Sequence, residues 1–258
     1  MQGPTIKTYL AQKMGIDPKK IVNVALTPCT AKKFEIRREE MNAAGKKLGI
    51  PEMRDMDYVV TTRELALWAK EAKIDFASLE DSDYDRFMGE ASGAGVIFGN
   101  TGGVMEAALR TAVEILNGKE APSIDVVEVR GTEGIKTASY KLGDINLNVA
   151  VASGTANAKK VLDAVKAGEL DVQFIEIMAC PGGCVNGGGQ PHQPASVRMN
   201  MDLRAVRASV LYNDDKNAEV RTSQDNLAVQ KLYDEFLEAP NSHKAHEILH
   251  TTYVKRGL

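Results

Sequence analysis

Short apolar runs alternate with amphipathic stretches over most of this chain. The apolar runs are brief and rich in β-branched side chains, which is the pattern of buried strands. They predict strands at residues 21–26, 57–60, 125–130, 145–152 and 173–178, and a short strand or the start of a loop at Gly95–Phe98.

Helical periodicity fills the intervals between these runs. Apolar residues spaced three and four apart predict helices at residues 5–14, 63–73, 101–117 and 155–167. Gly118 and Gly168 follow the last two helices, and glycine commonly stands just past a helix end. Strands and helices that alternate in this way predict an α/β fold with mostly parallel sheets flanked by helices.

The pattern changes at Gly187, where the run GGGQPHQPAS has the composition of a loop. Beyond it the chain shows no strand signal and two polar amphipathic helices, near residues 226–237 and 242–250. The sequence therefore predicts a main domain over residues 1–194 and a helical appendage over residues 195–258.

Composition narrows the possible partners. The 258 residues contain 32 Lys and Arg against 35 Asp and Glu, a formal net charge of −3, so no nucleic-acid partner is expected. No apolar run approaches the ~20 residues that span a bilayer, and the first residues lack the apolar core of a secretory signal. We therefore expect no membrane partner and a cytoplasmic location, where cysteines stay reduced and serve as metal ligands or catalytic groups.

Three cysteines carry the candidate chemistry. Cys29 stands in TPCTAKKFE, just past the strand predicted at residues 21–26, where α/β sheets commonly bind ligands. Cys180 and Cys184 stand in EIMACPGGCVNGGGQP, just past the strand predicted at residues 173–178. The glycines of this segment let the backbone approach a bound group closely and expose amide N–H groups to sulfur or an anion. Two thiols at this spacing among these glycines favour a bound centre over a structural turn, whereas Cys29 taken alone is more often a core residue than a ligand.

These segments resemble two signature motifs of the iron-only, or [FeFe]-, hydrogenases. The later segment matches the family pattern E-x-M-A-C-x-x-G-C-x-x-G-G-G-x-P at every specified position, and Pro28, Cys29, Lys32 and Glu35 match P-C-x-x-K-x-x-E. The stretch GVIFGNTGGVMEAALR is similar to a middle segment of the family's large subunit. The tail, with SHKAHEILHTTYVKR, is similar to the small-subunit region.

The resemblance implies a cofactor and roles for individual residues. The family holds the H-cluster, a [4Fe–4S] cubane joined by a cysteine sulfur to a two-iron subsite with CO, cyanide and dithiolate ligands. Cys29, Cys180 and Cys184 would ligate the cubane, and Cys184 would also bridge to the two-iron subsite. Lys32 would donate a hydrogen bond to a cyanide ligand, with a solvated lysine beside Lys33 as the alternative. Met178 and Phe98 would pack beside the two-iron subsite and exclude water, although plain core packing is the alternative for both.

The resemblance also implies a reaction and partners. The complete protein would be an anaerobic oxidoreductase that reversibly reduces protons to H₂. Its electrons would come from ferredoxin or from an NAD(P)H-linked subunit, and maturation proteins would supply the two-iron subsite.

Two features depart from the family pattern. The motif T-S-C-C-P-x-W, which supplies the fourth cubane ligand and the proton-shuttling cysteine, is absent. We therefore expect the sequence to be a piece of a longer or split protein that does not evolve H₂ alone. Thr27 stands where the family commonly has methionine, beside the two-iron subsite. This exchange favours a further interpretation, a hydrogen or redox sensor.

Other interpretations stay open. The hydrogenase-like cluster-assembly and prelamin-binding proteins share a similar segment and bind iron–sulfur clusters without H₂ chemistry. The residues Asn100-Thr101-Gly102-Gly103 either cap the following helix, bind an anion or line the site as a turn. His243, His246 and His250 share one face of a predicted helix, where polar packing is favoured over zinc binding.

Overall fold

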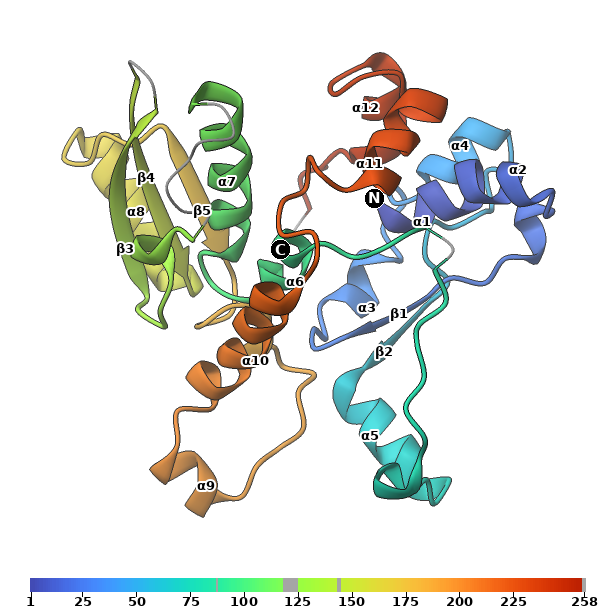
Figure 1. The fold of residues 1–258 in the computed structure, drawn as a ribbon, viewed down its shortest axis with the longest axis horizontal. Coiled ribbons are helices and arrows are strands. Elements are labelled where there is room, and N and C mark those ends of the chain that lie inside the picture. Colours follow the sequence, from blue (N-terminus) through green and yellow to red (C-terminus); the bar gives the residue numbers. More distant parts are fainter. Residues whose placement is uncertain (87, 118–124, 143–144, 257–258) are drawn as a thin grey trace. The chain divides into compact units, whose positions relative to one another are not determined.

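The computed structural model describes residues 1–86, 88–117, 125–142 and 145–256. The chain divides into two compact units (Figure 1). Unit 1 contains residues 1–90, 188–191 and 227–258, and unit 2 contains residues 91–187 and 192–226. The segment after residue 194 thus contributes its first part to unit 2 and its last part to unit 1.

Unit 1 is built around a two-stranded parallel sheet. Strand β1 (Val24–Thr27) pairs with β2 (Tyr58–Thr61), with Thr27 opposite Thr61 at the carboxyl ends of both strands. The expected N-terminal helix is continuous but irregular, because α1 (Gln2–Thr5) and α2 (Ala11–Met14) flank a π-helical turn, η1 (Ile6–Leu10). The short helices that follow are η2 (Pro18–Lys20), α3 (Lys32–Glu35), α4 (Ala43–Leu48) and η3 (Phe76–Ser78).

Helix α5 (Thr62–Glu71) begins where β2 ends. The Thr61 hydroxyl accepts a hydrogen bond from the Glu64 amide, and the Glu64 carboxylate accepts one from the Thr61 amide, which is a complete capping box. The last part of the chain supplies α11 (Leu227–Leu232), the π-helical turn η7 (Tyr233–Leu237) and α12 (His243–Leu249). Both helices expected in the tail are confirmed.

Unit 2 is built around a three-stranded sheet in the order β3-β4-β5. Strand β4 (Ile145–Ser153) lies between β3 (Ile135–Leu142), which is antiparallel to it, and β5 (Phe174–Met178), which is parallel. Parallel pairing therefore predominates among the described strands of the two sheets together. Helix α8 (Thr155–Ala167) links β4 to β5 and ends at Gly168 in the left-handed conformation, as expected.

Successive residues of β4 point to opposite faces of this sheet. Val149 and Val151 pack with Met105 and Leu109 of α7 (Gly103–Asn117), whereas Ala150 and Ala152 pack with Ala158 and Val161 of α8. The two helices therefore cover opposite faces, and the central strand is buried on both (Figure 1). The helix end expected at Gly118 lies outside the described residues.

Two strand predictions are wrong. The 125–130 segment contains a 3₁₀ turn, η5 (Val127–Val129), because its buried residues Val126 and Val129 are three apart and both join the core beneath α7. The 95–98 segment spans α6 (Gly93–Val96) and the 3₁₀ turn η4 (Ile97–Gly99). Here the Ser92 hydroxyl accepts a hydrogen bond from the Gly95 amide and starts a helix.

Besides the short helices of unit 1, the longer elements that the sequence did not predict lie in unit 2. They are β3, α9 (Ala195–Asn200) and α10 (Leu203–Asn217). A buried charge network connects α10 to α7, because Arg110 donates to Asp215 at 2.7 Å and to Glu106 at 2.7 Å. Among the described residues, no helix combines the length and the apolar content needed to cross a bilayer.

Candidate functional site

The loop with Cys29 follows β1 in unit 1. Thr27 is buried at the end of the strand, and Cys29, two residues later, is a half-buried thiol outside any disulfide. Lys32 begins α3, and its ammonium lies 2.9 Å from the carboxylate of Glu35. The Lys32 side chain is 47% exposed. The charged residues of the first motif therefore pair with each other at the surface, a few residues past the thiol.

A second surface ion pair connects α3 to the start of α5. The Lys33 ammonium lies 2.7 Å from the Glu64 carboxylate, which also closes the capping box at Thr61. The hydrogen bond from Lys33, with the one from the Thr61 backbone, lowers the pKa of Glu64 to about 2. This carboxylate is therefore ionised at neutral pH and connects α3 to the start of α5.

The glycines that end the later motif belong to unit 1 and lie against the Cys29 loop. The Gly189 amide donates to the Pro28 carbonyl at 2.7 Å. A side chain on Gly189 would place its Cβ 2.8 Å from Thr61 Cγ2, so only glycine fits. Arg63 fixes the same segment, because its guanidinium donates to the carbonyls of Gly188 and Gln190 at 2.7 and 2.8 Å. Sequence reasoning missed Arg63, since no motif marks it.

The loop with Cys180 and Cys184 follows β5 in unit 2. Cys180 is half-buried and Cys184 is exposed, and neither forms a disulfide bond. The Gly183 amide donates to the Cys180 carbonyl at 3.0 Å, and the 3₁₀ turn η6 (Cys184–Asn186) begins at the second cysteine. Both thiols thus lie just past the carboxyl end of the strand, as the sequence predicts.

Glycine is required inside this loop. Gly182 and Gly183 have φ angles of +85° and +96°, which side chains rarely adopt. A Cβ on Gly183 would lie 2.6 Å from the Thr101 nitrogen. The Thr101 amide in turn donates to the Gly182 carbonyl at 3.1 Å. The loop between the two cysteines therefore packs backbone against backbone on the turn at residues 100–103.

That turn is held by a carboxylate of the same motif. The buried Glu176 of β5 accepts hydrogen bonds from the amides of Gly102 at 2.6 Å and Met105 at 2.8 Å. The carboxylate thus satisfies amides at the start of α7 and opposes the positive end of that helix. The cap of α7 is therefore supplied by Glu176 of β5 rather than by the side chains of the turn, and the other two roles considered for the turn stay predictions.

The turn also contains a buried hydroxyl available to a further group. Thr101 Oγ1 is buried and has no hydrogen-bond partner among the described residues. Met178 is half-buried at the end of β5, and Phe98 is 42% exposed rather than part of the core. The two thiols lie on a loop whose glycines pack closely against the backbone of Thr101, and the Thr101 hydroxyl is unpaired. This arrangement fits a site that binds a group through sulfur.

The structure thus divides the expected site residues between its two units. The members in unit 1 are Thr27, Cys29 and Lys32. The members in unit 2 are Phe98, Met178, Cys180 and Cys184. The later motif itself crosses from one unit to the other, because its cysteines lie in unit 2 and its last glycines lie in unit 1.

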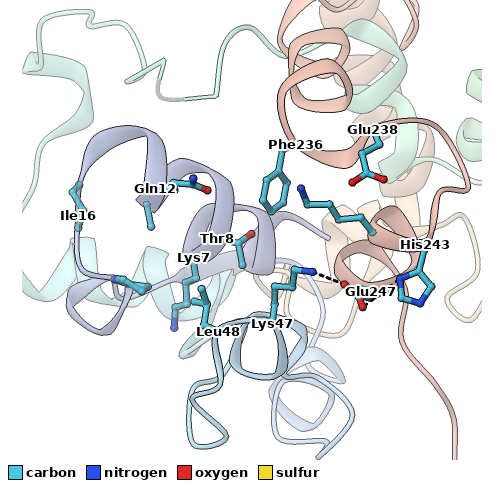
Figure 2. A pocket seen from close by; sticks show the side chains of 13 residues that line it. Lys7, Thr8, Gln12, Ile16, Lys47, Leu48, Phe236, Glu238, His243 and Glu247 are labelled. Carbon is cyan, nitrogen blue, oxygen red and sulfur yellow. Dashed lines mark hydrogen bonds and ion pairs between the residues drawn. The ribbon is translucent and has the colours of Figure 1, made fainter.

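A cavity of about 610 Å³ in unit 1 is lined by none of the motif residues named above. Figure 2 shows Lys47 directed toward Glu247, with which it forms an ion pair at 2.7 Å. Lys7, which also lines the cavity, is paired with Asp57 at 2.7 Å. Because these lysines are neutralised by their own partners and none of the described lining residues is a cysteine, the cavity is not a candidate for the cofactor.

The three tail histidines make two separate contacts, one between two histidines and one with a glutamate. The Nδ1 atoms of His246 and His250 are 2.9 Å apart, whereas His243 lies 3.4 Å from Glu247. Within the part of the chain that the structure describes, no third His, Cys, Asp or Glu joins either pair to make a metal site. Polar packing, which the sequence favours for these histidines, stays a prediction.

Comparisons with known proteins give a consistent result. Residues 1–188 match the family model "Iron only hydrogenase large subunit, C-terminal domain", and residues 201–256 match "Iron hydrogenase small subunit". The chain is 47% identical over 253 residues to iron hydrogenase 1 of Clostridium pasteurianum, covering 98% of this chain and 43% of that protein.

A solved structure and a more distant relative extend the comparison. The fold matches an [FeFe]-hydrogenase from Chlamydomonas reinhardtii with a TM-score of 0.77 and 41% identity, covering 98% of this chain and 68% of that chain. The nuclear prelamin A recognition factor of Homo sapiens is 30% identical over 262 residues, covering 98% of this chain and 53% of that protein. The chain spans about half the length of the curated relatives it matches.

Proposed function

Because the chain belongs to the iron-only hydrogenase family, we propose that it forms part of an enzyme that reversibly reduces protons to H₂. The observation that supports this most directly is the loop of Cys180 and Cys184. It presents two thiols on a glycine backbone packed against the turn at residues 100–103. The loop lies within the segment from Glu176 to Pro191, which matches every specified position of the family's motif.

We propose that Cys29, Cys180 and Cys184 hold the cubane of the H-cluster and that Cys184 also bridges to the two-iron subsite. When bound, this group supplies electron transfer and, at the two-iron subsite with its CO, cyanide and dithiolate ligands, the site of proton reduction. The protein's own contribution would be to supply three thiolates and to exclude water. Three thiols leave a cubane one ligand short of its usual four, so this chain is expected not to evolve H₂ by itself.

The remaining site residues act around that group. Lys32, whose ammonium is surface-exposed beside the Cys29 loop, would exchange Glu35 for a cyanide ligand as hydrogen-bond partner. Met178 and Phe98 would cover the two-iron subsite with apolar surface. Thr27 would place a hydroxyl where the family commonly has a thioether.

The family also motivates proposals about partners and location. We propose that electrons arrive from ferredoxin or from an NAD(P)H-linked subunit and that maturation proteins deliver the two-iron subsite. An anaerobic, cytoplasmic setting suits this chemistry. The proposed domain organisation places the large-subunit segment at residues 1–194 and the small-subunit segment at residues 195–258, and the matches to the two family models end at residue 188 and begin at residue 201.

Two alternatives are distinct from this proposal. The first is a hydrogenase-like protein that binds an iron–sulfur cluster without H₂ chemistry, and the match to a relative named for prelamin A recognition motivates it. Thr27 supports a hydrogen or redox sensor with altered tuning of the two-iron subsite.

Anaerobic reconstitution with iron and sulfide tests the cluster-binding part of the proposal. The full chain is expected to take up about four iron atoms, and Cys29→Ala, Cys180→Ala and Cys184→Ala are each expected to lower that number. His243→Ala, in the tail, is the matched control and should leave it unchanged. Equal iron content in all four variants would overturn the assignment of the ligands.

Loading with a synthetic two-iron subsite separates the hydrogenase from its alternatives. Infrared bands of CO and cyanide that appear in the loaded chain and disappear in Cys184→Ala would support the hydrogenase. A loaded cubane with no such bands would favour the cluster-binding alternative. A shift of those bands in Thr27→Met would support the tuning role of Thr27.

A further inference from the structure

Lys136 is a buried cation that the proposed function does not use. It lies on β3, is 8% exposed, and its ammonium donates to the carbonyls of Thr101 at 2.9 Å and Gly131 at 3.1 Å. Burial lowers the pKa of this lysine. Burying an ionised group costs free energy, so the presence of a lysine here indicates a role beyond packing.

The position of Lys136 in the sheet is matched by that of Glu176. Lys136 pairs in register with Val151 of β4, and Val151 pairs in register with Glu176 of β5. In-register neighbours point to the same face, so both charges lie on the face covered by α7, on either side of Val151. Two strand spacings separate their backbones by about 10 Å.

Both charges hold the turn that precedes α7, and they do so by complementary contacts. Glu176 accepts from the amides of Gly102 and Met105, whereas Lys136 donates to the carbonyl of Thr101. The Thr101 carbonyl and the Gly102 amide belong to one peptide group. An anion therefore holds the N–H end of that peptide while a cation holds its oxygen, and the two together fix its orientation.

Thr101 connects this peptide to the cysteine loop. Its carbonyl accepts from Lys136, and its amide donates to the carbonyl of Gly182 at 3.1 Å, between Cys180 and Cys184. The neighbouring Gly183 leaves no space for a side chain against the Thr101 nitrogen. A displacement of Thr101 would therefore displace the backbone between the two thiols.

We propose that Lys136 and Glu176 form a pair of positioning residues that fixes the Cys180–Cys184 loop through the backbone of Thr101. The effect on the loop is supported by contacts within unit 2. The effect on cluster binding rests on the proposed function. An apolar residue at position 136 would cost less free energy to bury than the lysine. It would, however, leave the Thr101 carbonyl without its hydrogen-bond donor.

Hydrogen exchange on the full chain without cofactor tests the geometry. In Lys136→Met the amide hydrogen of Thr101 is expected to exchange at least about tenfold faster, which corresponds to about 1.4 kcal/mol of lost protection. The amides of Gly182 and Gly183 should follow. Lys141→Met, at an exposed position on the same strand, and Lys7→Met, at a buried position in unit 1, are the controls and should leave these amides unchanged.

Three outcomes decide the proposal. Faster exchange confined to the turn and loop, with rescue by Lys136→Arg, supports it. Unchanged exchange at Thr101 overturns it, whatever the cluster content. Lys136→Met could instead lower protection throughout unit 2. In that case Lys136→Gln, which keeps a hydrogen-bond donor without the charge, must restore at least part of the protection of the Thr101 amide. If it does not, the proposal is also overturned.

A second readout separates this proposal from the function on which it partly rests. The reconstituted Lys136→Met chain is expected to show an altered electron paramagnetic resonance signal of the reduced cluster, while Lys141→Met keeps the original signal. Faster exchange at Thr101 in a chain that binds no cluster would contradict the proposed function and leave the positioning role intact. Faster exchange with an unaltered signal would contradict the role in cluster binding alone.

Discussion

The two cysteine-bearing loops follow parallel strands in the same way but are fixed by different forces. The Cys180–Cys184 loop of unit 2 is held by buried charges, since Glu176 and Lys136 are 6% and 8% exposed. The Cys29 loop of unit 1 is bordered by surface ion pairs, since the carboxylate partners of Lys32 and Lys33 are 39% and 48% exposed.

This difference predicts a difference in rigidity. Hydrogen bonds to a charged group contribute about 1.5–3 kcal/mol each, whereas an exposed ion pair contributes about 0–1 kcal/mol and weakens with salt. Unit 2 therefore presents its thiols on a frame that exists before a cofactor binds. In unit 1 the frame comes mainly from the backbone contact of Gly189 with Pro28 and from Arg63.

The largest expected effect comes from removing the buried carboxylate. Glu176→Gln keeps the shape of the side chain but removes the negative charge. The charged carboxylate accepts hydrogen bonds from the amides of Gly102 and Met105. The free energy of unfolding of unit 2 should fall by about 3 kcal/mol, measured by urea denaturation. The exposed Glu169→Gln is the control. A loss as small as that of the control would mean that the buried charge does not fix unit 2.

The next effect comes from filling the space at Gly183. Gly183→Ala introduces a Cβ 2.6 Å from the Thr101 nitrogen at a φ of +96°, so both a backbone clash and strain oppose it. We expect a loss of about 2 kcal/mol, measured by thermal unfolding. Gly168→Ala has a φ of +73° with nothing within 4 Å, and should cost about 1 kcal/mol. Equal losses in the two variants would show that the close approach to Thr101 is unimportant.

A smaller, pH-dependent effect is expected in unit 1. Because Lys33 and the Thr61 backbone lower the folded-state pKa of Glu64 to about 2, the stabilisation is present above the unfolded value near 4.5 and is lost as the pH falls toward 2. The unfolding midpoint of unit 1 should therefore decrease over this range, and that of Glu64→Gln should decrease less steeply. Identical slopes for the two proteins would contradict the capping role.

The smallest effect is expected at Lys32. Its ion pair with Glu35 is exposed, so Lys32→Ala should change the free energy of unfolding by less than about 1 kcal/mol in urea denaturation. Added salt should reduce even that difference. A loss comparable to that of Glu176→Gln would remove the contrast between the two loops.

Regular elements were predictable wherever local periodicity and burial agree. Helix α8 follows its apolar pattern from Thr155 to Ala167, and β4 and β5 follow their β-branched runs. The cysteine motifs were equally local, because the thiols and the glycines beside them are neighbours in the chain. Strand β3 was not predictable from its mixed run IKTASYKL, because pairing along β4 is what makes it a strand.

The sequence by itself determined the family, the α/β class and the three thiols, because each depends on short patterns of side-chain type. Tertiary structure alone decided what holds those thiols in place. Lys136 and Arg63 lie far along the chain from the backbone carbonyls that they bind, at Thr101 and Gly188. No local signal marks such contacts, since a lysine or an arginine acquires a buried or backbone partner only when distant segments pack together.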